Sequence, residues 1–450
     1  MTSGPAERVA HYVSRFARFA EQRGTQEPGW LRRLREQAIG SFEESGFPTT
    51  RLEEWRYTNL APIVAHPFEL ISPMGETPPR HQIEELAAPL FACSLLVFVN
   101  GHYRSELSTP VSLLGDTPVK NLAQVLTEDP ARLETHLAQQ ADFKGRPFVA
   151  LNTAFLEDGA LVEIPEGVRL DQPLHLLFLS TDAPAPGIVH PRVLVTAGEG
   201  SRATIIQQHL SIGAQPRLIN SVMEITTRAR ADLEFVLVQR ENDTSHHISS
   251  LHLHQAHDSR LACHTITLGG ALVRNDLTAI LAEEGAELDL RGLFFGEGGG
   301  VIDNHTLVDH ALPHCTSRQL YKGILSDHSR GVFRGRVIVR PDAQQSDARQ
   351  SNPNLLLSDG AEVDTKPQLE IYADDVKCSH GATIGQIDAD ALFYLRSRGI
   401  DEHAALELLT EGFAAEICQT LPAPALGERV RELLRDRLGD VSAGAAGMDS

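Results

Sequence analysis

A short theme that returns in steps of about 25 to 30 residues is the feature of this sequence that most restricts its fold. Each copy has a polar or acidic turn, often with glycine, then a small residue, then apolar residues that alternate with polar ones. One such coil cannot bury its apolar side alone, so a β-solenoid of stacked coils is the economical interpretation. A two-sheet sandwich or a cupin-like barrel of short strands is the alternative. The copies are EGSRATIIQQ (199–208), RARADLEFVLV (228–238), HDSRLACHTITL (257–268), EEGAELDLRGLFF (283–295), HSRGVFRGRVIV (328–339) and SDGAEVDTKPQLEIYA (358–373).

Helical periodicity replaces the theme at both ends of the chain. Apolar residues recur at helical spacing from Val9 to Phe19, and Asp388 and Asp401 can each cap a helix near the other end. We expect the C-terminal helices to cap the solenoid. An Asn-Gly turn at 100–101 predicts a β-hairpin, and a helical insert is expected near 122–139. The predicted units are an N-terminal helical region (1–85), a β core (86–387), a C-terminal helical domain (388–440) and a disordered tail (441–450).

Composition narrows the classes of function. The chain has 450 residues and a formal net charge of −20, so a broad basic face for nucleic acid is not expected. No stretch approaches the roughly 20 apolar residues of a membrane helix, and the charged N-terminus is not a secretory signal. Five cysteines without a CxxC pair suit reduced thiols. We therefore expect a cytoplasmic protein without a membrane or nucleic-acid partner.

Histidines gather in SHHISSLHLHQAH, residues 245–257. His252 and His254 are two residues apart and would share one face of a strand, with His257 close behind. A cupin-like or β-helix enzyme could use these three histidines as metal ligands. An exposed polar face explains the same pattern without a metal.

A second group of donors lies in HTLVDHALPHC, residues 305–315. His305, His310, His314 and Cys315 all suit a divalent metal, but their spacing matches no zinc motif. Histidines in solvated loops are the simpler interpretation.

The third candidate is KCSHG, residues 377–381, where a strand pattern gives way to glycine. If the chain stays extended here, Cys378 and His380 point to the same side and could share one ion. Lys377 beside them would favour a thiolate at Cys378. A buried structural cysteine with a surface histidine is the alternative.

The sequence contains little evidence for a catalytic site. The chain contains no GxSxG, no HExxH and no P-loop, because the glycine-rich GEGGG (296–300) lacks the lysine and hydroxyl residue that would reach phosphates. The chain is therefore not expected to hydrolyse ATP.

Three long runs of the sequence are distinctive: HTLVDHALPHCTSRQLYKGIL (305–325), FRGRVIVRPDAQQSDARQSNPNLLLSDGAEVDTKPQLEIYADDVKCSHGATIGQID (333–388) and LFYLRSRGI (392–400). Through these runs, from about residue 273 to 400, the sequence resembles the SufB/SufD family of iron-sulfur cluster assembly proteins, and more closely its SufD branch. The SufB branch has HEAT where SHGAT (379–383) stands here, and it has a cluster-ligating cysteine at the position of Leu395. RLEEWRYTNL (51–60) also looks like the family's helical leader.

The resemblance implies a right-handed parallel β-helix flanked by α-helical regions. It also implies a non-catalytic scaffold subunit that pairs with a SufB-like paralogue and a SufC-like ABC ATPase, with a homodimer as an option for the isolated chain. His380, with Cys378 as a second candidate, is expected to contribute to a transient iron-sulfur cluster shared with the paralogue. No cofactor is expected to be tightly bound in the isolated chain. The expected ATPase-docking residues are Leu392, Leu395, Ala405, Leu408, Leu409 and Phe413.

Overall fold

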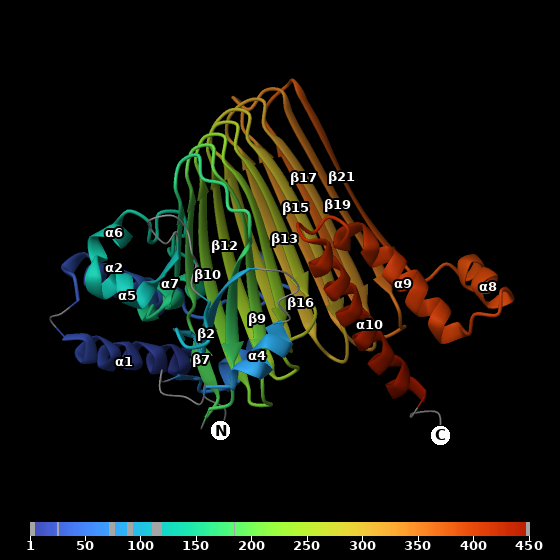
Figure 1. Ribbon diagram of the computed structural model, residues 1–450, viewed down its shortest axis with the longest axis horizontal. Coiled ribbons are helices and arrows are strands. Elements are labelled where there is room, and N and C mark those ends of the chain that lie inside the picture. Colours follow the sequence, from blue (N-terminus) through green and yellow to red (C-terminus); the bar gives the residue numbers. More distant parts are fainter. Residues whose placement is uncertain are drawn as a thin grey trace.

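Two long sheets face each other across one core in the computed structural model (Figure 1), which describes residues 5–24, 27–71, 77–87, 93–109, 119–183 and 185–446. From β5 to β21 every described strand pair is parallel, which is the pairing of a β-helix and not of a sandwich. Arg202 lies opposite Asp232, and Asp232 lies opposite Arg260, so the coil length agrees with the predicted repeat. The solenoid prediction is confirmed.

From β8 to β21 the strands alternate between the two sheets along the chain, so each of these coils adds one strand to each sheet. One sheet contains β1 (Glu69–Leu70), β4 (Val119–Asn121), β5 (Gly159–Ile164), β7 (Gly187–Val189), β8 (Arg192–Ala197), β10 (Arg217–Thr227), β12 (Ser245–Gln255), β14 (Leu272–Leu281), β16 (Val301–His310), β18 (Arg330–Val339) and β20 (Glu362–Ile371). The other contains β2 (Ser94–Val99), β3 (His102–Tyr103), β6 (Leu174–Ser180), β9 (Arg202–Ser211), β11 (Asp232–Arg240), β13 (Arg260–Thr267), β15 (Glu287–Gly296), β17 (Thr316–Leu325), β19 (Ser346–Leu356) and β21 (Val376–Gly385).

The interior between the sheets is mostly apolar. Alternate residues of each strand point inward, and side chains such as Phe235, Leu290 and Phe333 are completely buried there. A band of amide side chains interrupts this apolar packing, because Asn275 accepts a hydrogen bond from Gln239 (2.9 Å) and donates one to Asn304 (3.0 Å). Buried polar groups need such partners, so the stacked coils satisfy one another.

Most helices from the first 155 residues cover the outer face of the 11-stranded sheet, whereas Ile83 in the helix Arg80–Ala87 packs with strands of the 10-stranded sheet. Phe16, Phe42 and Trp55 pack with Phe155 and with Leu218 of β10 in one apolar cluster. The predicted hairpin and helical insert are confirmed: β2 and β3 pair around Asn100, and the insert at 122–139 contains two short helices rather than one. The helical elements are α1 (Pro5–Arg23), α2 (Gly29–Ser45), the 3-10 turn η2 (Glu53–Trp55), α3 (Ala61–Ala65), α4 (Arg80–Ala87), α5 (Leu122–Glu128), α6 (Pro130–Glu134) and α7 (Pro147–Phe155).

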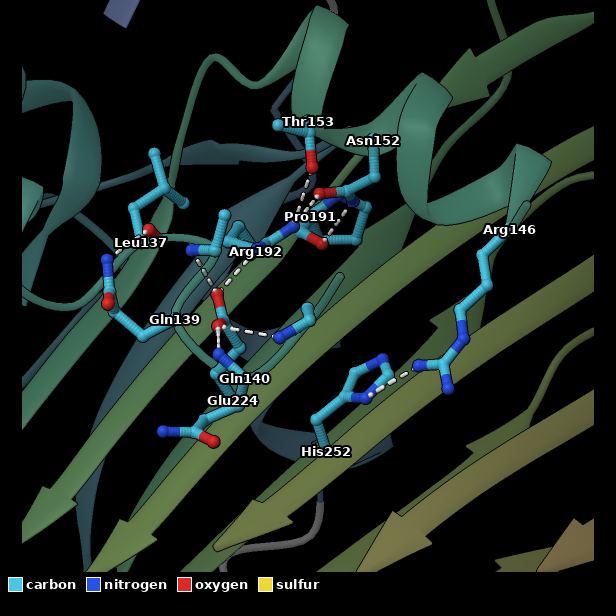
Figure 2. A network of polar contacts seen from close by, with 12 residues as sticks. Leu137, Gln139, Gln140, Arg146, Asn152, Thr153, Pro191, Arg192, Glu224 and His252 are labelled. Carbon is cyan, nitrogen blue, oxygen red and sulfur yellow. Dashed lines mark hydrogen bonds and ion pairs between the residues drawn. The ribbon is translucent and has the colours of Figure 1, made fainter. Parts of the chain in front are cut away.

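A buried ion pair fixes this helical layer to the β-helix (Figure 2). Arg192 Nη2 lies 2.5 Å from Glu224 Oε1, and both side chains are at most 3% exposed. Arg192 Nη1 reaches Asn152 and Thr153 of α7, and Glu224 accepts hydrogen bonds from the backbone N–H groups of the chain between α6 and α7. Both carboxylate oxygens and both terminal guanidinium nitrogens therefore have partners, as burial of two charges requires, and only Arg192 Nε has none.

The three C-terminal helices are α8 (Ala389–Ser397), α9 (Glu402–Cys418) and α10 (Pro424–Ala446), and Asp388 and Asp401 cap the first two as predicted. The prediction that they cap the solenoid is wrong, because α9 and α10 lie along the outer flank of the 10-stranded sheet (Figure 1). Ile417 packs there against residues such as Val236, and Lys322 Nζ lies 2.6 Å from Glu416 Oε2. Helix α10 reaches Ala446, inside the segment predicted to be disordered; residues 447–450 lie outside the described residues.

Candidate functional site

The last coil of the β-helix is open. Strands β20 and β21 end their sheets, and within the described part of the chain no further strand pairs with either of them. Most residues of this coil are exposed, including the apolar Ile371 (42%), Tyr372 (62%) and Ile384 (51%). Two adjacent edge strands with unpaired backbone groups and exposed apolar side chains form a surface suited to another β element.

Cys378 and His380 lie in β21, on this open end. Cys378 is opposite Ala348 and packs against the interior cluster, and His380 is opposite the buried Gln350. Because alternate residues of a strand share a side, both candidates face the interior side of the coil. Cys378 is half-buried and His380 is exposed. The extended chain expected from the sequence is confirmed, and it brings these two side chains to one side.

The thiol of Cys378 is less acidic than the sequence suggested. Partial burial raises its pKa, and the neighbouring Asp347 carboxylate raises it further. The expected help from Lys377 is absent, because adjacent residues of a strand point to opposite sides. Cys378 is thus a thiol that a metal must deprotonate on binding.

One thiol and one imidazole form an incomplete ligand set. Iron-sulfur clusters are held mainly by several cysteine thiolates, and the described residues around β21 offer no third donor in a cluster with these two. The open position of His380 leaves room for ligands from another chain. The arrangement can therefore supply part of a site at an interface.

The C-terminal helices present a second exposed apolar surface. Helix α8 projects away from the sheets (Figure 1), and none of its residues is buried. Phe393 and Tyr394 on it are 74% and 56% exposed, and Leu408 on α9 is 51% exposed.

The six residues expected for ATPase docking do not all share this surface. Ala405 is buried, whereas Leu392, Leu395 and Leu409 are half-buried. Phe413 is half-buried too, with Lys322 Nζ 4.6 Å from the centre of its ring. Leu408 is the member that is most available to a partner.

The histidines of the alternative enzyme do not form a metal site. His252 is buried on the outer face of β12, where Arg146 Nη1 lies 3.2 Å from its Nδ1 (Figure 2). His254 is half-buried further along the strand, and His257 is an exposed turn residue beside Asp258. A guanidinium against His252 disfavours a cation, and the three belong to no compact donor group of the described residues. The cupin-like alternative is not favoured.

The donors between 305 and 315 are also separated. His305 pairs with Asp303 on the outer face, whereas His310 faces inward and lies 2.7 Å from Ser317 Oγ. His314 is exposed in a turn, and Cys315 is buried. These four residues are close in sequence, but their side chains do not meet at one metal site.

One compact group of buried donors was missed by the sequence reasoning. His209, Glu241 and His247 come from three different strands or turns of the β-helix, and their ligand atoms lie within 4.8 Å of one another. His247 belongs to the histidine-rich stretch, but its partners are distant in sequence. Among the described helices, none is long and apolar enough to cross a membrane.

Two models of known protein families together match most of the chain. Residues 6–176 match the family described as SufBD protein N-terminal region. Residues 178–413 match the family described as SUF system FeS cluster assembly, SufBD core domain. The boundary between the two matches falls within β6.

Curated relatives align over nearly the whole chain. An iron-sulfur cluster assembly SufBD family protein of Synechocystis is 35% identical over 398 residues, covering 87% of this chain and 87% of the relative. The iron-sulfur cluster assembly protein SufD of Escherichia coli is 34% identical over 406 residues, covering 90% and 92%. The SufD protein of Bacillus subtilis is 23% identical over 430 residues, covering 92% and 95%.

Proposed function

Because this chain belongs to the SufB/SufD family of iron-sulfur cluster assembly proteins and is SufD-like, we propose that it is a non-catalytic scaffold subunit that completes a transient cluster site on a partner. The observation that carries the proposal is the position of His380, which is exposed on the last, unpaired coil of the β-helix. A ligand at the end of a solenoid can be shared only with a molecule that packs against that end.

The proposed partner at the open end is a SufB-like paralogue. A second β-helix would pair with the free edges of β20 and β21 and would cover the exposed Ile371, Tyr372 and Ile384. The paralogue or sulfide would supply the remaining ligands, since this chain offers one imidazole and one thiol. A site made from incomplete halves releases its cluster readily, which suits assembly and transfer.

The proposed role of Cys378 is support rather than primary ligation. Its thiol is half-buried against the interior cluster, and its raised pKa disfavours the thiolate that a cluster needs. A neutral imidazole binds a metal without losing a proton, and the imidazole of His380 is exposed.

A SufC-like ABC ATPase is the proposed partner of α8 and α9. The projecting helix α8 and the exposed Leu408 offer an apolar surface that is separate from the open end. The chain's lack of nucleotide motifs is consistent with ATP hydrolysis in the partner. We place this complex in the cytoplasm, since the five thiols are free and suit a reducing compartment.

Anaerobic reconstitution of the co-purified complex with ferrous iron and sulfide tests the ligand role. We expect His380→Ala to lower bound iron and sulfide several-fold while the complex still assembles. His257→Ala is the matched control, because His257 is also an exposed histidine but lies in the turn between β12 and β13, several coils away from β21. Undiminished cluster formation in the His380 variant would contradict the ligand role, and a loss in the control variant would revive the enzyme alternative.

A further inference from the structure

Inside the β-helix, three side chains of types that can bind metals lie together near one corner of the coils. His209 on β9 and His247 on β12 share the inward-facing side with interior apolar residues of their strands, and Glu241 follows the end of β11. All three are at most 2% exposed. Each offers one donor atom, and the three atoms lie within 4.8 Å of one another.

The carboxylate of Glu241 lacks the arginine partner that the buried acids Glu224 and Asp303 have. Glu224 is paired with Arg192, and Asp303 is paired with Arg274. Glu241 contacts His247, with 2.5 Å between Oε1 and Nδ1, and its second oxygen is buried without a hydrogen-bond partner. Among the described arginines and lysines, none forms an ion pair with it. A buried carboxylate without a cation is costly.

The two imidazoles are prepared to act as ligands. Burial lowers the pKa of His209 and of His247 to about 3, which favours the neutral imidazole that binds metals. Burial raises the pKa of Glu241 to about 7. The neighbouring Phe178 stacks on His209 at 5.0 Å between ring centres and excludes water from that side.

We propose that His209, Glu241 and His247 bind one divalent first-row transition ion, such as Zn²⁺ or Fe²⁺, inside the β-helix. Two imidazoles and one carboxylate are a ligand set that such ions prefer. Bonds of about 2.0 to 2.2 Å place two donors at most about 4.4 Å apart, so the present group needs to close only slightly. The ion takes the place of the proton between Glu241 and His247, and that proton leaves to solvent.

A fourth donor is available next to this group. The amide oxygen of Gln207 is buried without a partner, and the amide nitrogen of the same side chain lies 2.8 Å from His209 Nε2. Ser221 Oγ lies 2.8 Å from His247 Nε2 and holds that ring in place. Such outer contacts orient metal-binding histidines. The ion would be structural, joining successive coils, and it is independent of the shared cluster at His380; it revises the expectation that the isolated chain holds no bound cofactor.

Metal analysis of the untagged full-length chain tests this site. The chain is incubated with Zn²⁺, dialysed against a weak chelator and analysed for retained metal, and Co²⁺ is used as an absorbing substitute. We expect about one retained Zn²⁺ per chain and a Co²⁺ spectrum without the thiolate charge-transfer band that a cysteine ligand would give.

Three variants locate the ion. Glu241→Gln should weaken Zn²⁺ binding by more than the about 10- to 100-fold that loss of an outer-shell partner causes. His175→Gln is the matched control, because His175 is also buried but lies outside the group. A combined Cys378→Ser, His380→Ala variant should retain the ion. Retention in Glu241→Gln, or loss in the combined variant, would overturn the proposal.

A measurement on the unaltered chain covers the case in which Glu241→Gln does not fold. Zn²⁺ that binds only the folded state raises the melting temperature as its concentration increases. An unchanged melting temperature together with no retained metal would also overturn the proposal, leaving the group as a hydrogen-bonded chain from Ser221 through His247 to Glu241.

Discussion

Two buried glutamates of this protein, Glu224 and Glu241, have different partners, and the difference has measurable consequences for single residues. Although burial alone would raise the pKa of Glu224, the Arg192 charge and the backbone N–H groups of Gln140 and Ala141 lower it below its usual value. Glu241 has no such help, and its pKa is raised. Glu224 therefore holds the helical layer on the β-helix, whereas Glu241 is suited to bind a cation.

Replacing Glu224 with Gln should destabilise the fold by about 3 to 5 kcal/mol at neutral pH, because Arg192 is left buried without a countercharge. Urea unfolding followed by circular dichroism measures this difference. Glu128→Gln is a control, since that residue is exposed on α5.

The same pair predicts a pH dependence. The folded-state pKa of Glu224 is lowered from 4.5, so its stabilisation is present above about pH 4.5 and is lost as the pH falls through the folded-state value. The gap in stability between the natural chain and Glu224→Gln should therefore narrow below pH 4.5. A gap that stays constant across this range would contradict the ionised, paired state.

At the residue scale, the sequence predicted which side chains lie together when both belong to the same strand. Alternation places Cys378 and His380 on one side, and β21 has that geometry. The same alternation places Lys377 on the other side, which the expectation of a thiolate overlooked. His209, Glu241 and His247 meet only because coils stack, and no local spacing reports which residues of different coils will be opposite.

At the scale of the elements, helices α8 and α9 carry the proposed ATPase surface, which is separate from the open end of the β-helix. Their existence and N-caps were predictable from Asp388 and Asp401. Their position was not, because an apolar stripe on a helix does not say which surface it will cover. The flank of the 10-stranded sheet is apolar on its outer side too, with Ile206 and Val236 buried under the helices, and strands covered on both faces have no simple alternation.

Leu408→Asp should weaken binding of the SufC-like ATPase in a pull-down, because it places a charge on the exposed surface of α9. The fold should be unaffected, since the side chain is already 51% exposed. Leu52→Asp is the matched control: Leu52 is 53% exposed and lies in the N-terminal region. Equal ATPase binding by both variants, with unchanged helical content, would refute the docking surface.

At the scale of the whole molecule, the β-helix is covered on both flanks and open at one end. Most N-terminal helices cover one sheet, and α4, α9 and α10 lie on the other (Figure 1). The repeat in the sequence predicted the solenoid, since each coil needs a neighbour to bury its apolar side. It did not predict the open end, because the last coil repeats the same theme at 358–373.

Hydrogen–deuterium exchange of β20 and β21, in the isolated chain and in its complex with a SufB-like paralogue, tests the shared end most directly. In the isolated chain these edge strands should exchange faster than the inner strands β16 and β17. In the complex their exchange should slow by at least about tenfold, which corresponds to about 1.4 kcal/mol of added protection. A complex that forms while exchange in Glu362–Ile371 and Val376–Gly385 stays unchanged would contradict the proposal that the open end is half of a shared site.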